Sequence, residues 1–298
     1  MNALYDVPAP AKLNLFLHVV GRRADGYHSL QSLFVLIDWC DTLQFELRTD
    51  GRLSRHDLGP ALPADDLCLR AARLLQTESG TRLGVDISID KQVPWGAGMG
   101  GGSSDAASTL LALNRLWGLN WQRTRLLALG LRLGADVPFF VGGRNAFVEG
   151  VGERLTSVPV PEQWLAVVKP PAGIETRAIF ASPLLVRDTE AATLESLAAN
   201  TDQSIFDSGI LKAGFGRNDL QAAAEAECAQ VVQAASMLHQ QFGNSRMTGS
   251  GSAVFARAGT GPEPSALMPA VASGAVPGWV GRMCRSLNVH PLADWAAN

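Results

Sequence analysis

The sequence predicts an α+β fold, with strands and helices intermixed and no steady alternation of strand and helix. Residues 85–90 alternate strictly between apolar and polar side chains, which is typical of a strand with one packed face and one wet face. A dense glycine loop then leads into a helix that begins near Ser103. In the second half, an alanine-rich helix at Leu220–Gln241 is followed by a strand at Ala253–Ala256. The strand at residues 85–90, with one face exposed to solvent, favours an antiparallel or mixed sheet over a buried parallel one.

Three strands and one helix are expected before the strand at residues 85–90. Apolar runs place the strands at Leu13–Val19, Leu30–Ile37 and Leu43–Leu47, separated by turn-rich stretches. The acidic pair at 65–66 suits the N-terminus of a helix, and Gly80 lies just beyond its end. The buried face of this helix is expected to consist of Leu67, Ala71, Leu74 and Leu75.

The remaining elements continue the same mixture. The helix after the glycine loop is expected to bury Leu110, Leu113, Leu116 and Trp117. A second half starts near residue 159, with a strand at Trp164–Val168 and a helix near Thr176.

The composition is that of a globular protein rather than a disordered one. The chain has 298 residues, 47% hydrophobic and 18% charged, which is enough for one large or two medium domains with a sizeable core. Its 25 basic and 28 acidic residues give a net charge of −3, which argues against a nucleic-acid-binding surface or a polybasic membrane anchor. We therefore expect no nucleic-acid or membrane partner, and no feature identifies a protein partner.

The cysteines and the absence of a recognisable targeting segment indicate a cytoplasmic protein. The four cysteines are far apart and lack metal-ligand spacing, so we expect buried free thiols in a reducing cytoplasm. The first eleven residues contain no basic side chain of the kind a secretory signal needs. Residues 264–281 carry no charge, but three prolines interrupt them, so we expect a loop-rich buried segment and not a membrane span.

The strongest chemical feature is the glycine-rich loop at residues 96–102. Five of its seven residues are glycine, and it lies between a strand and a helix. Glycine lets backbone N–H groups converge on an anion without obstruction by Cβ, and the helix N-terminus adds its dipole. We therefore expect a phosphate cradle rather than a flexible surface turn, formed by Pro94, Gly96, Ala97, Gly98, Met99, Gly100, Gly101, Gly102, Ser103 and Ser104.

Three well-known nucleotide sites do not fit this loop. A P-loop ends in Gly-Lys-Ser/Thr, and no lysine follows here. The loop does satisfy G-x-G-x-x-G, but a dinucleotide site also expects an acidic residue about 20 positions further on. No Asp or Glu occurs between Asp105 and Asp136. The sequence also lacks the His-Arg-Asp and Asp-Phe-Gly motifs of protein kinases.

Three further segments carry residues suited to chemistry, although each is ambiguous alone. Lys12 and Asn14 lie on the same side at the start of the first strand, where a lysine is ordinarily a solvated strand end. Asp136 is a single carboxylate among apolar residues and glycines, which also suits a capping residue in a turn at a helix end. The small residues at 247–252 form a second loop that could close over a phosphate.

Together these segments resemble the GHMP small-molecule kinases, whose three motifs occur in this order. The motifs are Pro-Ala-Lys-Leu-Asn at 10–14, Gly-Ala-Gly-Met-Gly-Gly-Gly-Ser-Ser at 96–104 and Thr-Gly-Ser-Gly-Ser at 248–252. The match is closest to the branch that acts on cytidine-diphosphate-linked methylerythritol in non-mevalonate isoprenoid biosynthesis. Segments similar to that branch are distributed along nearly the full chain, at residues 21–28, 133–140, 149–153, 218–220 and 288–292.

The resemblance implies that ATP donates its γ-phosphoryl group to the 2-hydroxyl of that substrate, with Mg²⁺ bridging the ATP phosphates. Asp136 would accept or orient the hydroxyl proton, and Lys12 would lie beside both Asp136 and the γ-phosphate. A cation there keeps the carboxylate ionised and offsets charge on the transferring group. Whether Asp136 is a true base or only orients the hydroxyl stays open, since loose transition states need little deprotonation. The Mg²⁺ ligands stay unassigned, with Ser104 as a weak candidate.

The resemblance also implies a substrate site. Tyr27, His28 and Phe180 would hold the cytosine by stacking and by contact with its polar edge, and Asn14 and Thr176 would reach the methylerythritol hydroxyls. With the second small-residue loop, the implied substrate-binding residues are Asn14, Tyr27, His28, Thr176, Phe180, Thr248 and Gly249.

The fold implied by the family has two domains, at residues 1–158 with the ATP loop and at 159–298, with the active site in the cleft between them. Two alternatives stay open. One is another kinase of the family, of the homoserine or mevalonate type, whose substrate carries no base for Tyr27, His28 and Phe180 to bind. The other is a non-catalytic nucleotide-binding sensor on the same fold, against which the presence of Lys12 and Asp136 argues.

Overall fold

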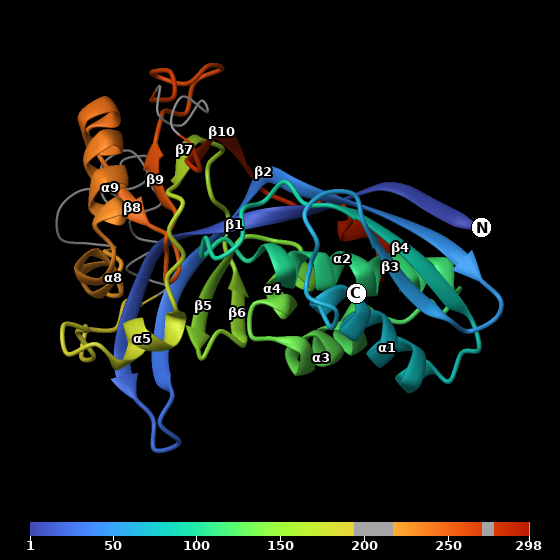
Figure 1. The fold of residues 1–298 in the computed structure, drawn as a ribbon. Coiled ribbons are helices and arrows are strands. Elements are labelled where there is room, and N and C mark those ends of the chain that lie inside the picture. The colour runs from blue at the N-terminus through green and yellow to red at the C-terminus, as the bar shows by residue number, and fades with distance from the viewer. Residues whose placement is uncertain (194–216, 270–276, 298) are drawn as a thin grey trace.

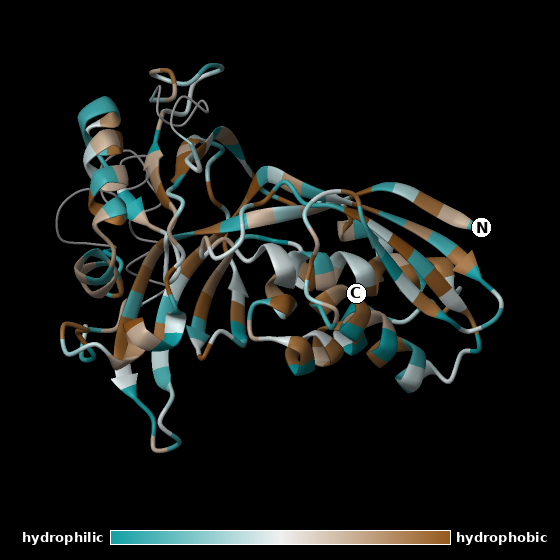
Figure 2. Ribbon diagram, viewed as in Figure 1, coloured by the Kyte–Doolittle hydropathy of each residue, from teal (hydrophilic) through white to brown (hydrophobic). Residues whose placement is uncertain are grey.

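The computed structural model describes residues 1–193, 217–269 and 277–297 and confirms the expected α+β class. Two long strands, β1 (Ala3–Arg22) and β2 (His28–Arg48), pair antiparallel and run through much of the molecule (Figure 1). The hairpin tip that joins them is hydrophilic, whereas hydrophobic residues follow the central strands (Figure 2).

The strands of the described residues form one mixed sheet of ten strands. Along its main path the order is β3-β4-β2-β10-β7-β9-β8, with β1 and β5 also paired to β2, and β6 paired to β5. The pair β3–β4 is parallel and the other named pairs are antiparallel, which agrees with the expected mixed or antiparallel sheet. The bounds are β3 (Leu53–Asp57), β4 (Gly84–Asp90), β5 (Ala146–Gly150), β6 (Arg154–Ser157), β7 (Trp164–Lys169), β8 (Arg246–Met247), β9 (Val254–Arg257) and β10 (Val280–Leu287).

The helices form two groups. Helices α1–α4 lie together against the sheet of the first half, and α8 and α9 lie beside β8 and β9 at the other end (Figure 1). Their bounds, with those of the remaining helices, are α1 (Leu67–Ser79), α2 (Gly101–Leu116), α3 (Arg123–Leu133), α4 (Val137–Gly142), α5 (Thr176–Ala181), α8 (Gln221–Glu227), α9 (Ala229–Phe242) and the 3₁₀ helix η2 (Ala293–Trp295).

The core surrounds both faces of the central strands. One hydrophobic cluster packs α1–α4 against β1, β2 and β4, and a second packs the opposite faces of β1 and β2 against β7 and β9. Leu36 belongs to the first cluster and its neighbours Val35 and Ile37 to the second, so β2 is buried on both faces here. Ala97 and Met99 of the glycine loop join the second cluster, which anchors the loop in the core.

Helix α1 and strand β4 form as the sequence predicts. Asp66 caps α1, because its side chain accepts a hydrogen bond from the Leu69 N–H, and Gly80 ends the helix with a φ of 68°. Within the predicted apolar face, Ala71 and Leu75 are fully buried, and the two remaining leucines are partly buried.

The bounds of the first strands differ from the expected ones. Strand β1 begins ten residues earlier and passes through two prolines, which a register shift between Pro10 and Lys12 helps to accommodate. The two runs expected as separate strands are one strand, β2, because Cys40, Asp41 and Thr42 between them continue to pair with β1.

The single alanine-rich helix was also a wrong expectation. The backbone of Cys228 is extended (φ −144°, ψ 98°), and it divides this segment into α8 and α9. No glycine or proline marks the break, so the sequence pattern continues across it.

Two predictions about burial are only partly right. All four cysteines are free, but only Cys68 and Cys284 are buried, and burial raises the pKa of the Cys68 thiol. Leu267 is 81% exposed, so the first part of segment 264–281 is not buried, and its residues 270–276 lie outside the described part. No helix within the described residues is both long and apolar enough to cross a membrane.

Candidate active site

The glycine loop presents backbone N–H groups at the N-terminus of α2. Gly96, Gly98 and Gly100 adopt left-handed φ values of 60°, 72° and 70°, which favour glycine. Gly100 precedes α2, and the Ser104 N–H makes the first helical bond to its carbonyl at 2.9 Å. The N–H groups of the first turn therefore lack acceptors within the helix and are directed out of its N-terminal end, as an anion site requires.

A second glycine turn, residues 248–252, holds the loop in place. The Ser252 N–H donates to the Gly96 carbonyl at 3.1 Å, and the Ala253 N–H donates to the Ala97 carbonyl at 3.2 Å. The Lys12 N–H donates to the Met99 carbonyl at 2.9 Å, so β1 also fixes the loop. The glycine loop is therefore a packed element and not a flexible surface turn.

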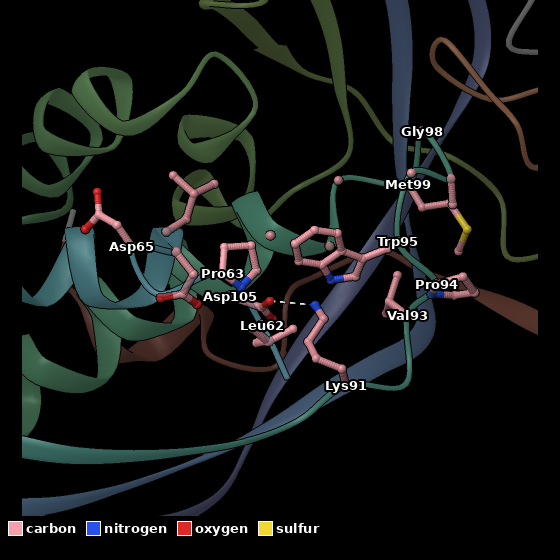
Figure 3. Close-up of a pocket in the computed structure, with 17 residues that line it drawn as sticks. Leu62, Pro63, Asp65, Lys91, Val93, Pro94, Trp95, Gly98, Met99 and Asp105 are labelled. Atoms are coloured by element: carbon pink, nitrogen blue, oxygen red, sulfur yellow. Dashed lines mark hydrogen bonds and ion pairs between the residues drawn. The ribbon is translucent and has the colours of Figure 1, made fainter. Parts of the chain in front are cut away.

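The loop forms one wall of the cavity shown in Figure 3, which is called the nucleotide cavity after the ligand that the family resemblance implies for it. Ser104 does not line it, because its buried hydroxyl donates to the Pro10 carbonyl at 2.7 Å, and Ser103 does not line it either. Trp95 is 60% exposed at this cavity. The other predicted cradle residues do line it, together with Leu62, Pro63, Asp65, Asp66, Leu67, Lys91, Val93, Trp95 and Asp105.

Lys12 and Asp136 meet beside the glycine loop. The Lys12 Nζ lies 3.6 Å from the Asp136 Oδ2, donates to the Asn14 Oδ1 at 2.6 Å and lies 4.3 Å from the centre of the Phe34 ring. Lys12 is only 3% exposed, so it is not a solvated strand end. Burial lowers the pKa of Lys12, and the charge of Asp136 opposes that change.

The side chain of Asp136 does not cap a helix. It lies directly before α4, in the capping position, but its side chain makes no capping hydrogen bond. Its carboxylate instead faces Lys12, with the side chain 33% exposed. This arrangement leaves a carboxylate oxygen available to a hydroxyl group in the adjoining cavity.

A hydrogen-bond network joins these groups to the second glycine turn. The Asn14 N–H donates to the Thr248 Oγ1 at 2.9 Å, and the Asn14 Nδ2 donates to the Ser32 Oγ at 2.8 Å. The Thr248 Oγ1 lies within hydrogen-bonding distance of the Asn14 Oδ1 and of the Gly98 carbonyl, at 3.2 and 3.3 Å. Thr248 is fully buried, so it orients the walls of the site from behind.

Two adjoining cavities, named here after the ligand parts that the family resemblance implies, lie between the Lys12–Asp136 pair and the hairpin tip. The acceptor cavity is lined by Lys12, Asn14, Ser32, Phe34, Asp136, Thr176, Phe180, Gly249 and Ser250, among others. The base cavity is lined by Arg22, Gly26, Tyr27, His28, Leu30, Val151, Thr176, Arg177, Phe180 and Ala181. Leu30, Val151, Thr176 and Phe180 line both, so the two cavities adjoin.

The base cavity has an aromatic wall. The rings of His28 and Phe180 stack with their centres 5.2 Å apart and their planes at 24°. Tyr27 is 67% exposed on the hairpin tip. Arg187 joins the two stacked residues, because its Nε donates to the His28 Nε2 at 3.3 Å and its Nη2 donates to the Phe180 carbonyl at 3.1 Å.

The charge around His28 favours a neutral ring. Burial, Arg187 and Arg22 lower the pKa of His28. With Nε2 accepting from Arg187, a neutral ring carries its proton on Nδ1, where it can be donated to a hydrogen-bond acceptor. Sequence reasoning missed Arg187, because no motif surrounds it and its contact with His28 spans 159 residues.

The comparisons with known proteins agree on one family. The family described as "GHMP kinases N terminal domain" matches residues 66–144. The chain is 67% identical to a 4-diphosphocytidyl-2-C-methyl-D-erythritol kinase from Methylibium petroleiphilum, over 99% of both chains. It is 54% identical to the enzyme of that name from Albidiferax ferrireducens, over 100% of this chain and 97% of the other.

Solved structures give the same result for the fold. A crystal structure of 4-(cytidine 5'-diphospho)-2C-methyl-D-erythritol kinase matches with a TM-score of 0.73 and 31% identity, covering 94% of this chain and 98% of the other. A homoserine kinase from Cytophaga hutchinsonii matches with a TM-score of 0.66 at 14% identity, covering 97% and 96%, which shows a common fold alone.

Proposed function

Because this chain belongs to the 4-diphosphocytidyl-2-C-methyl-D-erythritol kinases, a branch of the GHMP kinases, we propose that its cavities hold the two substrates of that reaction. The enzyme transfers a phosphoryl group from ATP to the 2-hydroxyl of 4-(cytidine 5'-diphospho)-2-C-methyl-D-erythritol. The products are the 2-phosphate and ADP, in non-mevalonate isoprenoid precursor biosynthesis. The alternative acceptors, homoserine and mevalonate, and a non-catalytic sensor are not favoured by these comparisons.

ATP enters the nucleotide cavity with its phosphates on the N–H groups of the glycine loop. Those groups lie next to Lys12, whose main chain is bonded to the Met99 carbonyl. The ammonium of Lys12 then offsets the charge that develops on the transferring group. Asp136 accepts a hydrogen bond from the acceptor hydroxyl and aligns it for in-line attack, or takes its proton as the bond forms.

The acceptor lies across the two adjoining cavities. Its methylerythritol end faces Asn14 and Thr176, whose hydroxyl already lies 2.7 Å from that of Ser250. Its cytosine reaches the wall of His28 and Phe180, with Tyr27 on the hairpin tip. The observation that carries this assignment is the shared lining of the cavities, since it gives one molecule with a polar and an aromatic end a continuous path.

Two arginines of the base cavity suit the diphosphate of the acceptor. Arg22 lies at the end of β1 and Arg177 lies in α5, and both line the base cavity with His28. Guanidinium groups bind phosphate oxygens through paired N–H donors.

Mg²⁺ is proposed to enter with ATP and to be held mainly by the phosphates. Mg²⁺ in kinase sites commonly keeps several waters and takes one or two carboxylates besides the phosphates. The described residues contain no group of three acidic, His or Cys side chains that could hold a metal ion. Asp136, whose side chain is 33% exposed, is the carboxylate that would contact the ion. Ser104 would not, because its hydroxyl donates to the Pro10 carbonyl. The ion would neutralise charge on the phosphates.

The domain division and the location are also proposals. We propose domains at residues 1–158 and 159–298 that share the continuous sheet. The last residues return to the first domain, since the Arg123 guanidinium donates to the Ala296 carbonyl at 2.8 Å.

Four free thiols support a location in the cytoplasm, where thiols stay reduced.

The reaction is tested by measuring ADP release from ATP and Mg²⁺ with three separate acceptors. We expect ADP release with cytidine-diphospho-methylerythritol and none above background with homoserine or mevalonate. Turnover with homoserine or mevalonate, but not with the cytidylated acceptor, would overturn the assignment of the base cavity. ATP binding without turnover of any acceptor would instead indicate a sensor.

Phe180→Ala tests the base cavity separately. We expect the KM for the cytidylated acceptor to rise about 10-fold or more, because stacking on a base contributes about 1–3 kcal/mol. The KM for ATP should not change, since Phe180 does not line the nucleotide cavity. Phe242→Ala, at the end of α9, removes a ring of the same size outside both cavities and serves as the control. An unchanged KM for the acceptor in Phe180→Ala would remove the ring from the proposed site.

A further inference from the structure

We infer that Asp41, Lys91 and Asp105 form a clamp that holds the glycine loop in its phosphate-binding shape. The inference rests on the proposed binding of ATP at this loop, and it makes all three side chains positioning residues for the nucleotide. None of them belongs to the three sequence motifs of the family resemblance, and the reaction described above does not use them.

The clamp is a buried ion triad. The Lys91 Nζ lies 2.6 Å from the Asp105 Oδ2 and also donates to the Asp41 Oδ2. The side chains of Lys91, Asp41 and Asp105 are 8%, 0% and 4% exposed. Figure 3 shows the Lys91–Asp105 pair among the residues that line the nucleotide cavity.

The triad connects the two ends of the loop. Asp41 lies in β2, and its Oδ1 accepts from the N–H groups of Gln92 and Val93 at 2.6 and 2.7 Å. It therefore fixes the segment that enters the loop. Asp105 lies in the second turn of α2, just after the C-terminal end of the loop. Lys91 bonds to both aspartates and so sets the distance between entry and exit.

The triad also lies close to the N–H groups that would meet the phosphates. A Cβ placed on Gly101, the first residue of α2, would lie 3.4 Å from the Lys91 Nζ and 3.1 Å from the Val93 Cγ1. A movement of Lys91 would therefore be transmitted to the first turn of α2. Lys91 and Asp105 line the nucleotide cavity, but the ammonium of Lys91 is already paired with two carboxylates, those of Asp105 and Asp41.

The conformational freedom of the glycine loop explains why it needs a clamp. A segment with five glycines has many accessible backbone conformations, so ordering it is costly in entropy. A buried triad with two carboxylates and one cation contributes little net stability. Burial and Asp41 raise the pKa of Asp105, which Lys91 opposes, and its Oδ1 has no partner within the described part of the chain. What the triad supplies is a fixed geometry at the loop.

The decisive variant is Asp105→Asn, because it has nearly the same shape and leaves Lys91 paired with Asp41. The measurements are the Kd of ADP and of adenosine by calorimetry and the KM of both substrates. We expect the Kd of ADP and the KM for ATP to rise about 10-fold or more, since a small misplacement of binding groups can cost about 10²-fold. Adenosine affinity and the KM for the acceptor should stay within about twofold, because the clamp acts on the phosphate end.

Ser108→Ala is the matched control. Ser108 lies one turn further along α2, is fully buried and donates to the Pro8 carbonyl at 2.9 Å. Its loss should lower thermal stability and leave the Kd of ADP unchanged. Asp41→Asn cuts the other arm of the clamp and should also weaken ADP, which keeps the test available if Asp105→Asn does not fold.

The outcomes separate the inference from the proposed function. Folded Asp105→Asn and Asp41→Asn proteins that bind ADP as the wild type does would overturn the clamp, whatever their stability. An equal loss for ADP and adenosine would also overturn it, because the effect would then not be confined to the phosphates. A wild-type protein that does not bind ADP would overturn the proposed ATP site itself and the clamp with it.

Discussion

Replacing Asp136 with Asn should lower kcat by at least about 10²-fold while nucleotide binding is retained, as loss of a positioned acid–base group typically does. The carboxylate lies 3.6 Å from the Lys12 Nζ and lines the acceptor cavity, whereas it does not line the nucleotide cavity. An amide of the same shape can still contact the hydroxyl but cannot take its proton or balance the charge of Lys12. Steady-state ADP release and calorimetry with ADP measure the two effects separately.

Asp50→Asn is the control for this charge change, since Asp50 is exposed and paired with Arg48 away from the cavities. Turnover like that of the wild type in Asp136→Asn would refute the proposed role.

The pH profile of the Asp136→Asn variant provides a second test. Burial lowers the pKa of Lys12 and Asp136 raises it, so the pKa of Lys12 should fall further in the variant. Residual activity should therefore decline at a lower pH on the alkaline side, as Lys12 loses its charge.

Local sequence signals predicted the parts of the fold that depend on neighbouring residues. The capped start of α1 at Asp66, its end at Gly80 and the alternation in β4 each follow from a few adjacent side chains. The break at Cys228 and the continuity of β2 do not, because they depend on packing and on strand pairing with distant segments. Predictions failed where tertiary contacts decide the backbone.

The site shows the same division. The side chains of Lys12 and Asn14, two residues apart on one strand, are hydrogen-bonded to each other as their predicted common side allows. Asp136 joins them from 124 positions further along the chain, and only the resemblance to a family indicated that meeting. The triad around Lys91 had no such guide, because its partners lie 50 and 14 residues away and match no motif. The roles of the individual site residues stay predictions.

Gly98→Ala should reduce kcat/KM for ATP by about 10²-fold or more, because the glycine loop would have to move by about 1 Å. A Cβ on Gly98 would lie 2.2 Å from the Thr248 carbonyl oxygen and 3.1 Å from the Gly251 N. Both are backbone atoms, so no side chain can turn aside to make room. The φ of 72° adds strain for any residue with a Cβ.

Gly118→Ala separates the clash from the strain. Gly118 has a similar φ of 65°, but no atom lies within 4 Å of its added Cβ, and it lines none of the three cavities. This control should lower the free energy of unfolding by about 1 kcal/mol and leave the kinetics unchanged. If Gly98→Ala behaved like Gly118→Ala, backbone strain alone would account for the result. The contact between the glycine loop and the turn at 248–252 would then not determine the shape of the phosphate site. A selective loss in Gly98→Ala would show that this contact sets the position of the loop for ATP.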